Sequence, residues 1–85
     1  MADEVFLYTL STCPWCRKAK QWFTERGVAF EAVDVDLLSG QEQEAAAEKA
    51  HQLSGGRRFP VAVINGEVVV GFNPERYREL VNGTG

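Results

Sequence analysis

The residues best suited to chemistry are two cysteines, Cys13 and Cys16, which are separated by Pro14 and Trp15. A Cys-x-x-Cys pair between a predicted strand and a predicted helix is typical of a redox-active dithiol. The first cysteine then lies at the helix start, where unpaired N–H groups and the helix dipole favour a thiolate. Since the thiolate is the form that attacks disulfides, we expect Cys13 to be the nucleophile and Cys16 the resolving thiol.

Two other interpretations of the pair have less support. A structural zinc site needs about four ligands, and the chain offers only these two cysteines and the single histidine, His51. A structural disulfide would close a loop too short to stabilise the fold appreciably. We therefore expect no resident metal and interpret the pair as a redox-active dithiol.

The segments on either side of the pair have the patterns that position such a dithiol. Val5 to Leu10 is an almost continuous apolar run, which predicts a central strand covered on both faces. A helix is predicted from Pro14, which suits a first helical position, to about Arg26. Helical spacing gives it an inner face of Cys16, Ala19, Trp22 and Phe23 and an outer face of Arg17, Lys18, Lys20 and Gln21. Arg17 and Lys18 are either solvated or close enough to the thiols to favour a thiolate.

The rest of the chain predicts one more strand and helix, a hairpin and a last helix. The hairpin turn is Asn65-Gly66 between two branched runs, and Asn73-Pro74 supplies an N-cap and a first helical proline. A capping box, Ser39 to Glu42, opens the middle helix. The predicted ranges are strand 29–35, helix 40–53, strands 61–64 and 67–70, and a helix from 74 to Asn82-Gly83. The order is βαβαββα, an α/β arrangement in one domain, residues 1–85.

Composition excludes several classes of partner. The net charge is −3 without a long basic run, which argues against nucleic acid and membrane surfaces as partners. No apolar run reaches membrane-spanning length. Residues 1–4 are acidic and lack the features of a signal peptide. We therefore expect a cytoplasmic protein, and in that reducing compartment a Cys-x-x-Cys pair is more often catalytic than structural.

Cys13-Pro14-Trp15-Cys16 resembles the dithiol site of the glutaredoxins, whose middle pair is usually proline and an aromatic residue. Arg58-Phe59-Pro60 before the hairpin and Gly71-Phe72 after it lie where that family has its other landmarks, so the resemblance covers almost the whole chain. It implies the thioredoxin fold, a four-stranded mixed sheet with helices on both faces. It also implies a cis Phe59–Pro60 bond beside the reactive sulfur.

The resemblance implies a thiol–disulfide oxidoreductase that reduces protein or glutathione-mixed disulfides. The backbone before Pro60 would pair with the substrate as a short strand addition. We expect a monomer without a bound cofactor. The substrate-binding residues implied are Pro14, Trp15, Arg58, Phe59, Pro60, Gly71 and Phe72.

Departures from the family concern the electron donor. Many glutaredoxins hold glutathione with a Thr-Val-Pro before the hairpin and a Gly-Gly followed by a polar or acidic pair after it. Here Arg58-Phe59-Pro60 and Gly71 to Glu75 replace them. The second segment is closer to small redoxins that reduce ribonucleotide reductase and take electrons from thioredoxin reductase. Glutathione and a thioredoxin-reductase-type enzyme are both candidate donors, and we expect the flavin enzyme to be the better one.

A non-enzymatic function is the alternative. Some glutaredoxins hold an iron–sulfur cluster with the first cysteine and glutathione from two chains. The aromatic-proline dithiol site favours redox catalysis over this function. Anaerobic purification would distinguish them, since a cluster gives a brown protein.

Overall fold

The computed structural model describes residues 4–56 and 58–81. All seven predicted elements are present in the predicted order, with one additional 3₁₀ helix, η1. The second strand is shorter than predicted because Val35 already begins η1. The elements are β1 (Val5–Thr9), α1 (Pro14–Glu25), β2 (Glu31–Asp34), η1 (Val35–Leu37), α2 (Gly40–Ser54), β3 (Val61–Ile64), β4 (Glu67–Val70) and α3 (Pro74–Leu80).

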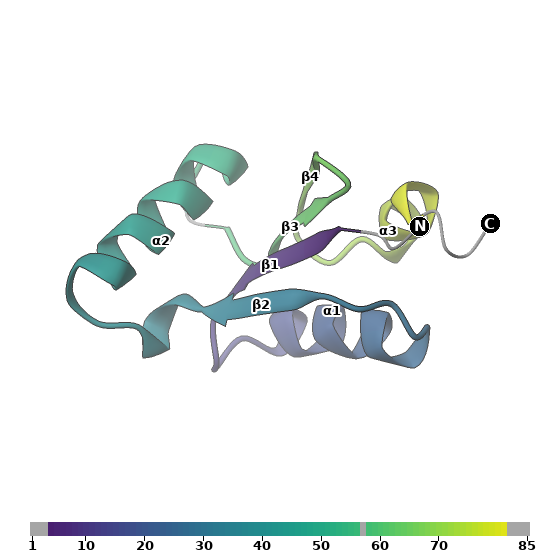
Figure 1. The fold of residues 1–85 in the computed structure, drawn as a ribbon, viewed down its shortest axis with the longest axis horizontal. Helices are drawn as coiled ribbons and strands as arrows, with labels where there is room; N and C mark the ends of the chain where they lie inside the picture. The colour runs from purple at the N-terminus through teal and green to yellow at the C-terminus, as the bar shows by residue number, and fades with distance from the viewer. Residues whose placement is uncertain (1–3, 57, 82–85) are drawn as a thin grey trace.

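The four strands form one mixed sheet in the order β2-β1-β3-β4 (Figure 1). β1 pairs in parallel with β2, as the helical connection between them requires. β3 is antiparallel to β1 and to β4. This is the thioredoxin fold that the family resemblance implied, and β1, which leads into the cysteine pair, is an inner strand.

The main core lies between the sheet and helices α1 and α3. All four predicted inner residues of α1 are buried, and Trp22 and Phe23 pack against Tyr77 of α3. On β1 the burial alternates, with Val5, Leu7 and Thr9 buried and the residues between them half-buried. β1 is the central strand that the sequence predicted, but its second face is covered less completely. The reason is that α2, on the other face, packs mainly on η1, β3 and β4 (Figure 1).

Local signals account for most element boundaries. Asn65 and Gly66 have φ angles of 50° and 89°, the positive values that a type I′ hairpin turn needs. The Asn73 side chain accepts a hydrogen bond from the Arg76 N–H at 3.2 Å and caps α3. Ser39 is the N-cap of α2, but its side chain makes no capping hydrogen bond, so the predicted capping box is not formed. Within the described residues, no helix is both long and apolar enough to cross a bilayer.

Candidate active site

The two cysteines occupy different environments at the start of α1. Cys13 is the N-cap residue in extended conformation, and Pro14 takes the first helical position as predicted. The Cys13 N–H donates to the Leu10 carbonyl at 3.2 Å, which closes the turn from β1 into α1. Cys13 is half-buried whereas Cys16 has no exposed surface, and both thiols are free. A disulfide in solution can therefore reach Cys13 but not Cys16.

Burial also sets the protonation of the inner thiol. The pKa of Cys16 is raised to about 12, chiefly by burial and to a smaller extent by the neighbouring Cys13. The Leu10 N–H, 3.4 Å from the Cys16 sulfur, and the charge of Lys20 act in the opposite direction. Cys16 is thus a thiol at neutral pH. The hydrogen bond with Cys13 and the charge of Cys13 both raise the pKa of Cys16, and both influences would change once Cys13 is in a disulfide.

A cis-proline turn joins the site to the end of the hairpin. The Phe59–Pro60 bond is cis, as the family resemblance implied, and Pro60 is buried. The Gly71 N–H donates to the Pro60 carbonyl at 2.7 Å. The Tyr77 hydroxyl donates to the Gly71 carbonyl, also at 2.7 Å, and burial raises the pKa of Tyr77 to about 12, so that it remains a donor. These bonds fix Pro60 and Gly71 relative to α3.

Trp15 and Phe72 meet on the surface, and we call this pair the aromatic ledge. Their ring centroids are 6.1 Å apart with an interplanar angle of 28°. Trp15 is 54% exposed, while Phe72 is half-buried and contacts Tyr77 in the core. The Lys18 ammonium lies 4.7 Å from the centroid of the Trp15 ring. Two predicted substrate-binding residues from distant parts of the chain therefore form one apolar surface beside the cysteines.

Arg17, Lys18 and Arg58 are all exposed. Arg17 donates from its guanidinium to the Ser11 carbonyl at 3.5 Å, and Lys18 lies over Trp15. Arg58 lies in the loop before Phe59. Arg57, the other arginine of that loop, is outside the described residues. Arg17 therefore contacts the loop before α1, and Lys18 contacts the ring of Trp15.

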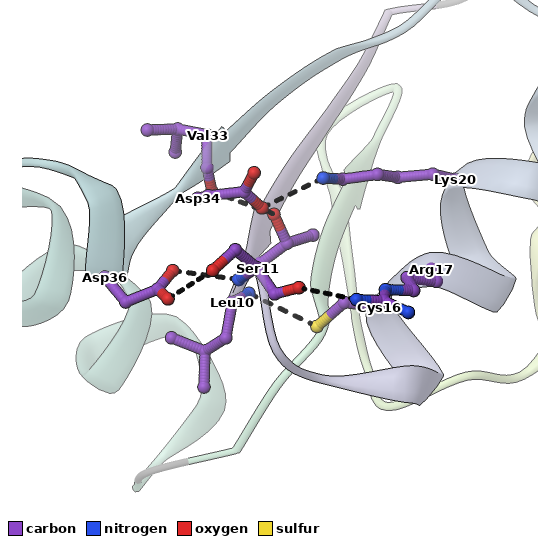
Figure 2. Close-up of polar contacts among 9 residues, drawn as sticks. Leu10, Ser11, Cys16, Arg17, Lys20, Val33, Asp34 and Asp36 are labelled. Carbon is purple, nitrogen blue, oxygen red and sulfur yellow. Dashed lines mark hydrogen bonds and ion pairs between the residues drawn. The ribbon is translucent and has the colours of Figure 1, made fainter.

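Two carboxylates, Asp34 at the end of β2 and Asp36 in η1, bind the segment that carries the site (Figure 2). Asp36 accepts from the N–H and the hydroxyl of Ser11, at 2.8 and 2.5 Å, and these bonds hold the pKa of Asp36 below its usual value. Asp34 accepts from the buried Thr9 hydroxyl at 2.5 Å, and the Lys20 ammonium lies 2.9 Å from the same oxygen. These contacts, with Thr9 the larger contribution, lower the pKa of Asp34.

Lys20 is the residue whose position the sequence prediction got wrong. It was assigned to the solvent face of α1, yet its side chain is only 32% exposed and it points to Asp34 (Figure 2). The signal was available in the spacing, because Lys20 follows Cys16 by four residues and residues four apart share a helix face. A charged residue on an otherwise buried face needs a partner. Here that partner is Asp34.

A groove of about 350 Å³ lies beside the cis-proline turn. Leu10, whose backbone bonds to both cysteines, lines this groove together with the half-buried Phe59, and His51 of α2 contributes to its wall. In the part of the chain that the structure describes, no three His, Cys, Asp or Glu side chains are grouped as metal ligands. The remaining lining residues are Val35, Asp36, Gln43, Glu44 and Ala47.

Comparison with known proteins gives one consistent family. A family model described as Glutaredoxin matches residues 5–69. An uncharacterized glutaredoxin-like 8.6 kDa protein in the rubredoxin operon of Clostridium pasteurianum is 32% identical over 75 residues, 88% of this chain and 93% of that protein. By contrast, the chain spans about half the length of the glutaredoxins 1 of several Rickettsia species that it also matches.

Solved structures agree with this assignment. The glutaredoxin of Archaeoglobus fulgidus superposes with a TM-score of 0.86 at 41% identity, covering 98% of this chain and 89% of that one. The NrdH-redoxin of Escherichia coli, a glutaredoxin-like protein with a thioredoxin-like activity profile, gives a TM-score of 0.72 at 30% identity. That alignment covers 91% of this chain and 93% of the redoxin.

Proposed function

The chain belongs to the glutaredoxin family of thiol–disulfide oxidoreductases, and on that basis we propose that it is a cytoplasmic enzyme that reduces protein or glutathione-mixed disulfides through a Cys13–Cys16 dithiol/disulfide cycle. The observation that carries this proposal is the asymmetry of the two thiols. Cys13 is accessible at the helix N-terminus, and Cys16 is completely buried one turn further along. One thiol can attack a substrate, and the other can react only within the protein.

The cycle has two exchange steps. The Cys13 thiolate attacks one sulfur of the substrate disulfide, and the other sulfur leaves as a thiolate that takes up a proton. Cys16 then loses its proton and attacks the Cys13 sulfur of the mixed disulfide, which releases the second substrate thiol. The substrate gains two electrons and two protons, and the protein is left with a Cys13–Cys16 disulfide for the donor to reduce.

The surfaces around Cys13 suit a protein partner. In this proposal the backbone of Phe59 pairs with the chain that carries the reactive disulfide, while Pro60, Pro14 and Gly71 shape the site. The aromatic ledge supplies an apolar contact, because half-exposed aromatic residues contribute strongly to protein interfaces. Arg58, exposed next to Phe59, would meet acidic groups of a partner or of glutathione.

We also propose that a thioredoxin-reductase-type enzyme is a better donor than glutathione, with ribonucleotide reductase among the possible substrates. Two observations support this. Phe72 stands where many family members have a glycine and is engaged by Trp15 and Tyr77. Asn73 uses its side-chain oxygen to cap α3. In this proposal an apolar ring and a helix cap thus take the place of the residues that hold the glutathione carboxylate in many family members. We propose that the protein works as a monomer and carries no resident cofactor.

Two cysteine variants test the proposed cycle. Cys13→Ser should abolish disulfide reduction, and Cys16→Ser should accumulate a mixed disulfide with a protein substrate that mass spectrometry locates on Cys13. Substantial turnover by Cys13→Ser, or an adduct on Cys16 in that variant, would reverse the roles of the two thiols. A brown protein with visible absorbance after anaerobic purification would favour the cluster-binding function instead.

A further inference from the structure

The second step of the cycle needs a group that the dithiol alone does not supply. Cys16 has no exposed surface, and burial disfavours the thiolate that must attack Cys13. The hydrogen bond from the Leu10 N–H to the Cys16 sulfur, at 3.4 Å, offers some compensation. This bond lowers the pKa of Cys16 more than any other group does, yet that pKa remains at about 12. A cation close to Cys16 would therefore have a direct effect on the resolving step.

Among the described residues, Lys20 is the cation whose charge lowers the pKa of Cys16. It lies four residues further along α1, on the same face of the helix, and its positive charge acts on the Cys16 sulfur. The other titratable groups that face this sulfur among the described residues are Cys13 on the same helix and Tyr77 of α3. Both are neutral in the mixed disulfide, since Cys13 is then bonded and Tyr77 keeps its proton.

The position of Lys20 is fixed from the neighbouring strand. Its ammonium is 2.9 Å from Asp34 Oδ1 at the end of β2 (Figure 2). Thr9, completely buried, has its hydroxyl 2.5 Å from that carboxylate oxygen and 3.0 Å from the Val33 carbonyl. A hydroxyl has one proton to donate, and the charged acceptor at the shorter distance forms the stronger bond. Thr9 of β1 thus holds the Asp34 carboxylate in place, and Asp34 in turn holds the Lys20 ammonium.

We propose that Lys20, held in place by Asp34 and Thr9, is a positioning residue for the resolving step, where its charge favours the thiolate of Cys16 as that thiolate attacks the Cys13 mixed disulfide. This inference rests on the proposed dithiol cycle. The proton of Cys16 passes to solvent or to the departing substrate thiolate. Lys20 keeps its own protons and forms no bond to sulfur.

The expected size of the effect follows from two opposing terms. Asp34 offsets part of the charge of Lys20, so we take the lower end of the effect that an opposite charge has on a neighbouring group, a change in pKa of about 1. Removing the charge would then lower the thiolate fraction about tenfold. The more basic thiolate is also about threefold more nucleophilic, because reactivity rises with roughly the square root of basicity. The net result at neutral pH is resolution about threefold slower.

Stopped-flow reaction of the reduced protein with Ellman's reagent separates the two steps. Attack by Cys13 releases one coloured thiolate at a rate proportional to reagent concentration, and attack by Cys16 releases the second at a rate independent of it. We would compare Lys20→Gln, which is neutral but can still donate to Asp34, with Lys20→Met and Lys20→Arg. Lys49→Met, which removes one exposed positive charge from α2, is the matched control.

We expect Lys20→Gln and Lys20→Met to slow the second release about threefold at neutral pH. Lys20→Arg should restore the rate, and Lys49→Met should leave it unchanged. An unaltered second phase in both neutral variants would overturn the proposal. So would slowing by Lys49→Met, or no rescue by arginine. If one neutral variant does not fold, the other decides.

Failure of the underlying cycle has a different signature. If the wild-type protein releases only one coloured thiolate, or if Cys16→Ser still releases two, then Cys16 does not resolve the mixed disulfide. That result would refute the dithiol cycle itself. A normal two-phase reaction that is insensitive to Lys20 would refute only the role of Lys20.

Discussion

Trp15→Ala should separate partner docking from redox chemistry. Trp15 is the most exposed aromatic residue described near the cysteines, at 54%. It lies between the two thiols in sequence but packs on Phe72. The substitution removes half of the aromatic ledge without altering Cys13, Cys16 or Pro14. We therefore expect it to affect reactions with a protein partner more than reactions with a small thiol.

The cost to stability should be modest. The lost contact with Phe72 is worth about 0.5–1.5 kcal/mol. The contact with the Lys18 ammonium, at an exposed site, adds about 0.5–1 kcal/mol. Alanine is a better helix former than tryptophan, which returns up to about 0.7 kcal/mol. A net loss of about 1 kcal/mol should leave the protein folded, and urea denaturation would verify this.

The cost to docking should be larger. A tryptophan near the centre of an interface contributes 2 kcal/mol or more when it is replaced by alanine. A loss of about 2 kcal/mol corresponds to roughly a 30-fold decrease in kcat/KM for a protein partner. A small dithiol makes no comparable contact with the ring. Its reaction with the Cys13–Cys16 disulfide should therefore be nearly unchanged.

The assay follows reduction of the oxidised protein by thioredoxin reductase with NADPH, and in parallel by dithiothreitol. Val68→Ala is the control, because Val68 is also an exposed apolar residue, 38% exposed, but lies on β4 near the hairpin turn. It should alter neither reaction. If Trp15→Ala slowed both reductants equally, or slowed neither, the ledge would not be a docking surface.

The remaining predictions concern stability and the donor. Asp34→Asn should cost about 1–3 kcal/mol in the free energy of unfolding at neutral pH, because a charged acceptor is lost from Thr9 and Lys20. Because the pKa of Asp34 is lowered in the folded protein, its contribution to stability is present above the unfolded pKa of about 3.9 and is lost as the pH falls through the lower folded pKa. The difference in unfolding free energy between Asp34→Asn and wild type, measured by urea denaturation, should therefore narrow below about pH 4. A difference that stays constant with pH would contradict this prediction. In coupled assays, thioredoxin reductase with NADPH should exceed glutathione with glutathione reductase, and efficient glutathione turnover without any reduction by thioredoxin reductase would refute the proposed donor.

The elements of this fold were predictable because their signals are local. Asn65-Gly66 determines a two-residue hairpin wherever it occurs between branched runs, and Asn73-Pro74 determines a helix start. The cysteine pair was placed correctly between β1 and α1 for the same reason. The predicted capping box was wrong: Ser39 is the N-cap residue of α2, but its side chain makes no capping hydrogen bond. Sequence position specifies a helix start better than it specifies a hydrogen bond.

Interactions between elements were harder to predict. The partner of Lys20 is fourteen residues away on β2, and nothing in the local sequence pairs it with Asp34 rather than with water. Trp15 and Phe72 likewise meet because α1 and the segment after β4 pack on the same core. Such contacts depend on the register of the sheet and the docking of the helices, which the one-dimensional pattern constrains only loosely.

The parallel pairing of β1 and β2 explains how one short segment distinguishes two chemically identical thiols. Parallel strands bring their carboxyl ends to the same edge of the sheet, so residues 9–11 lie beside Asp34 at the end of β2 and Asp36 in η1. Asp36 fixes Ser11, Leu10 bonds to both Cys13 and Cys16, and Asp34 connects Thr9 to Lys20. The segment between β1 and α1 is therefore supported from β2 at the residues that contact the thiols. A substitution at the end of β2, although distant in sequence from the cysteines, should alter the reactivity of Cys16 before it alters the exposure of Cys13.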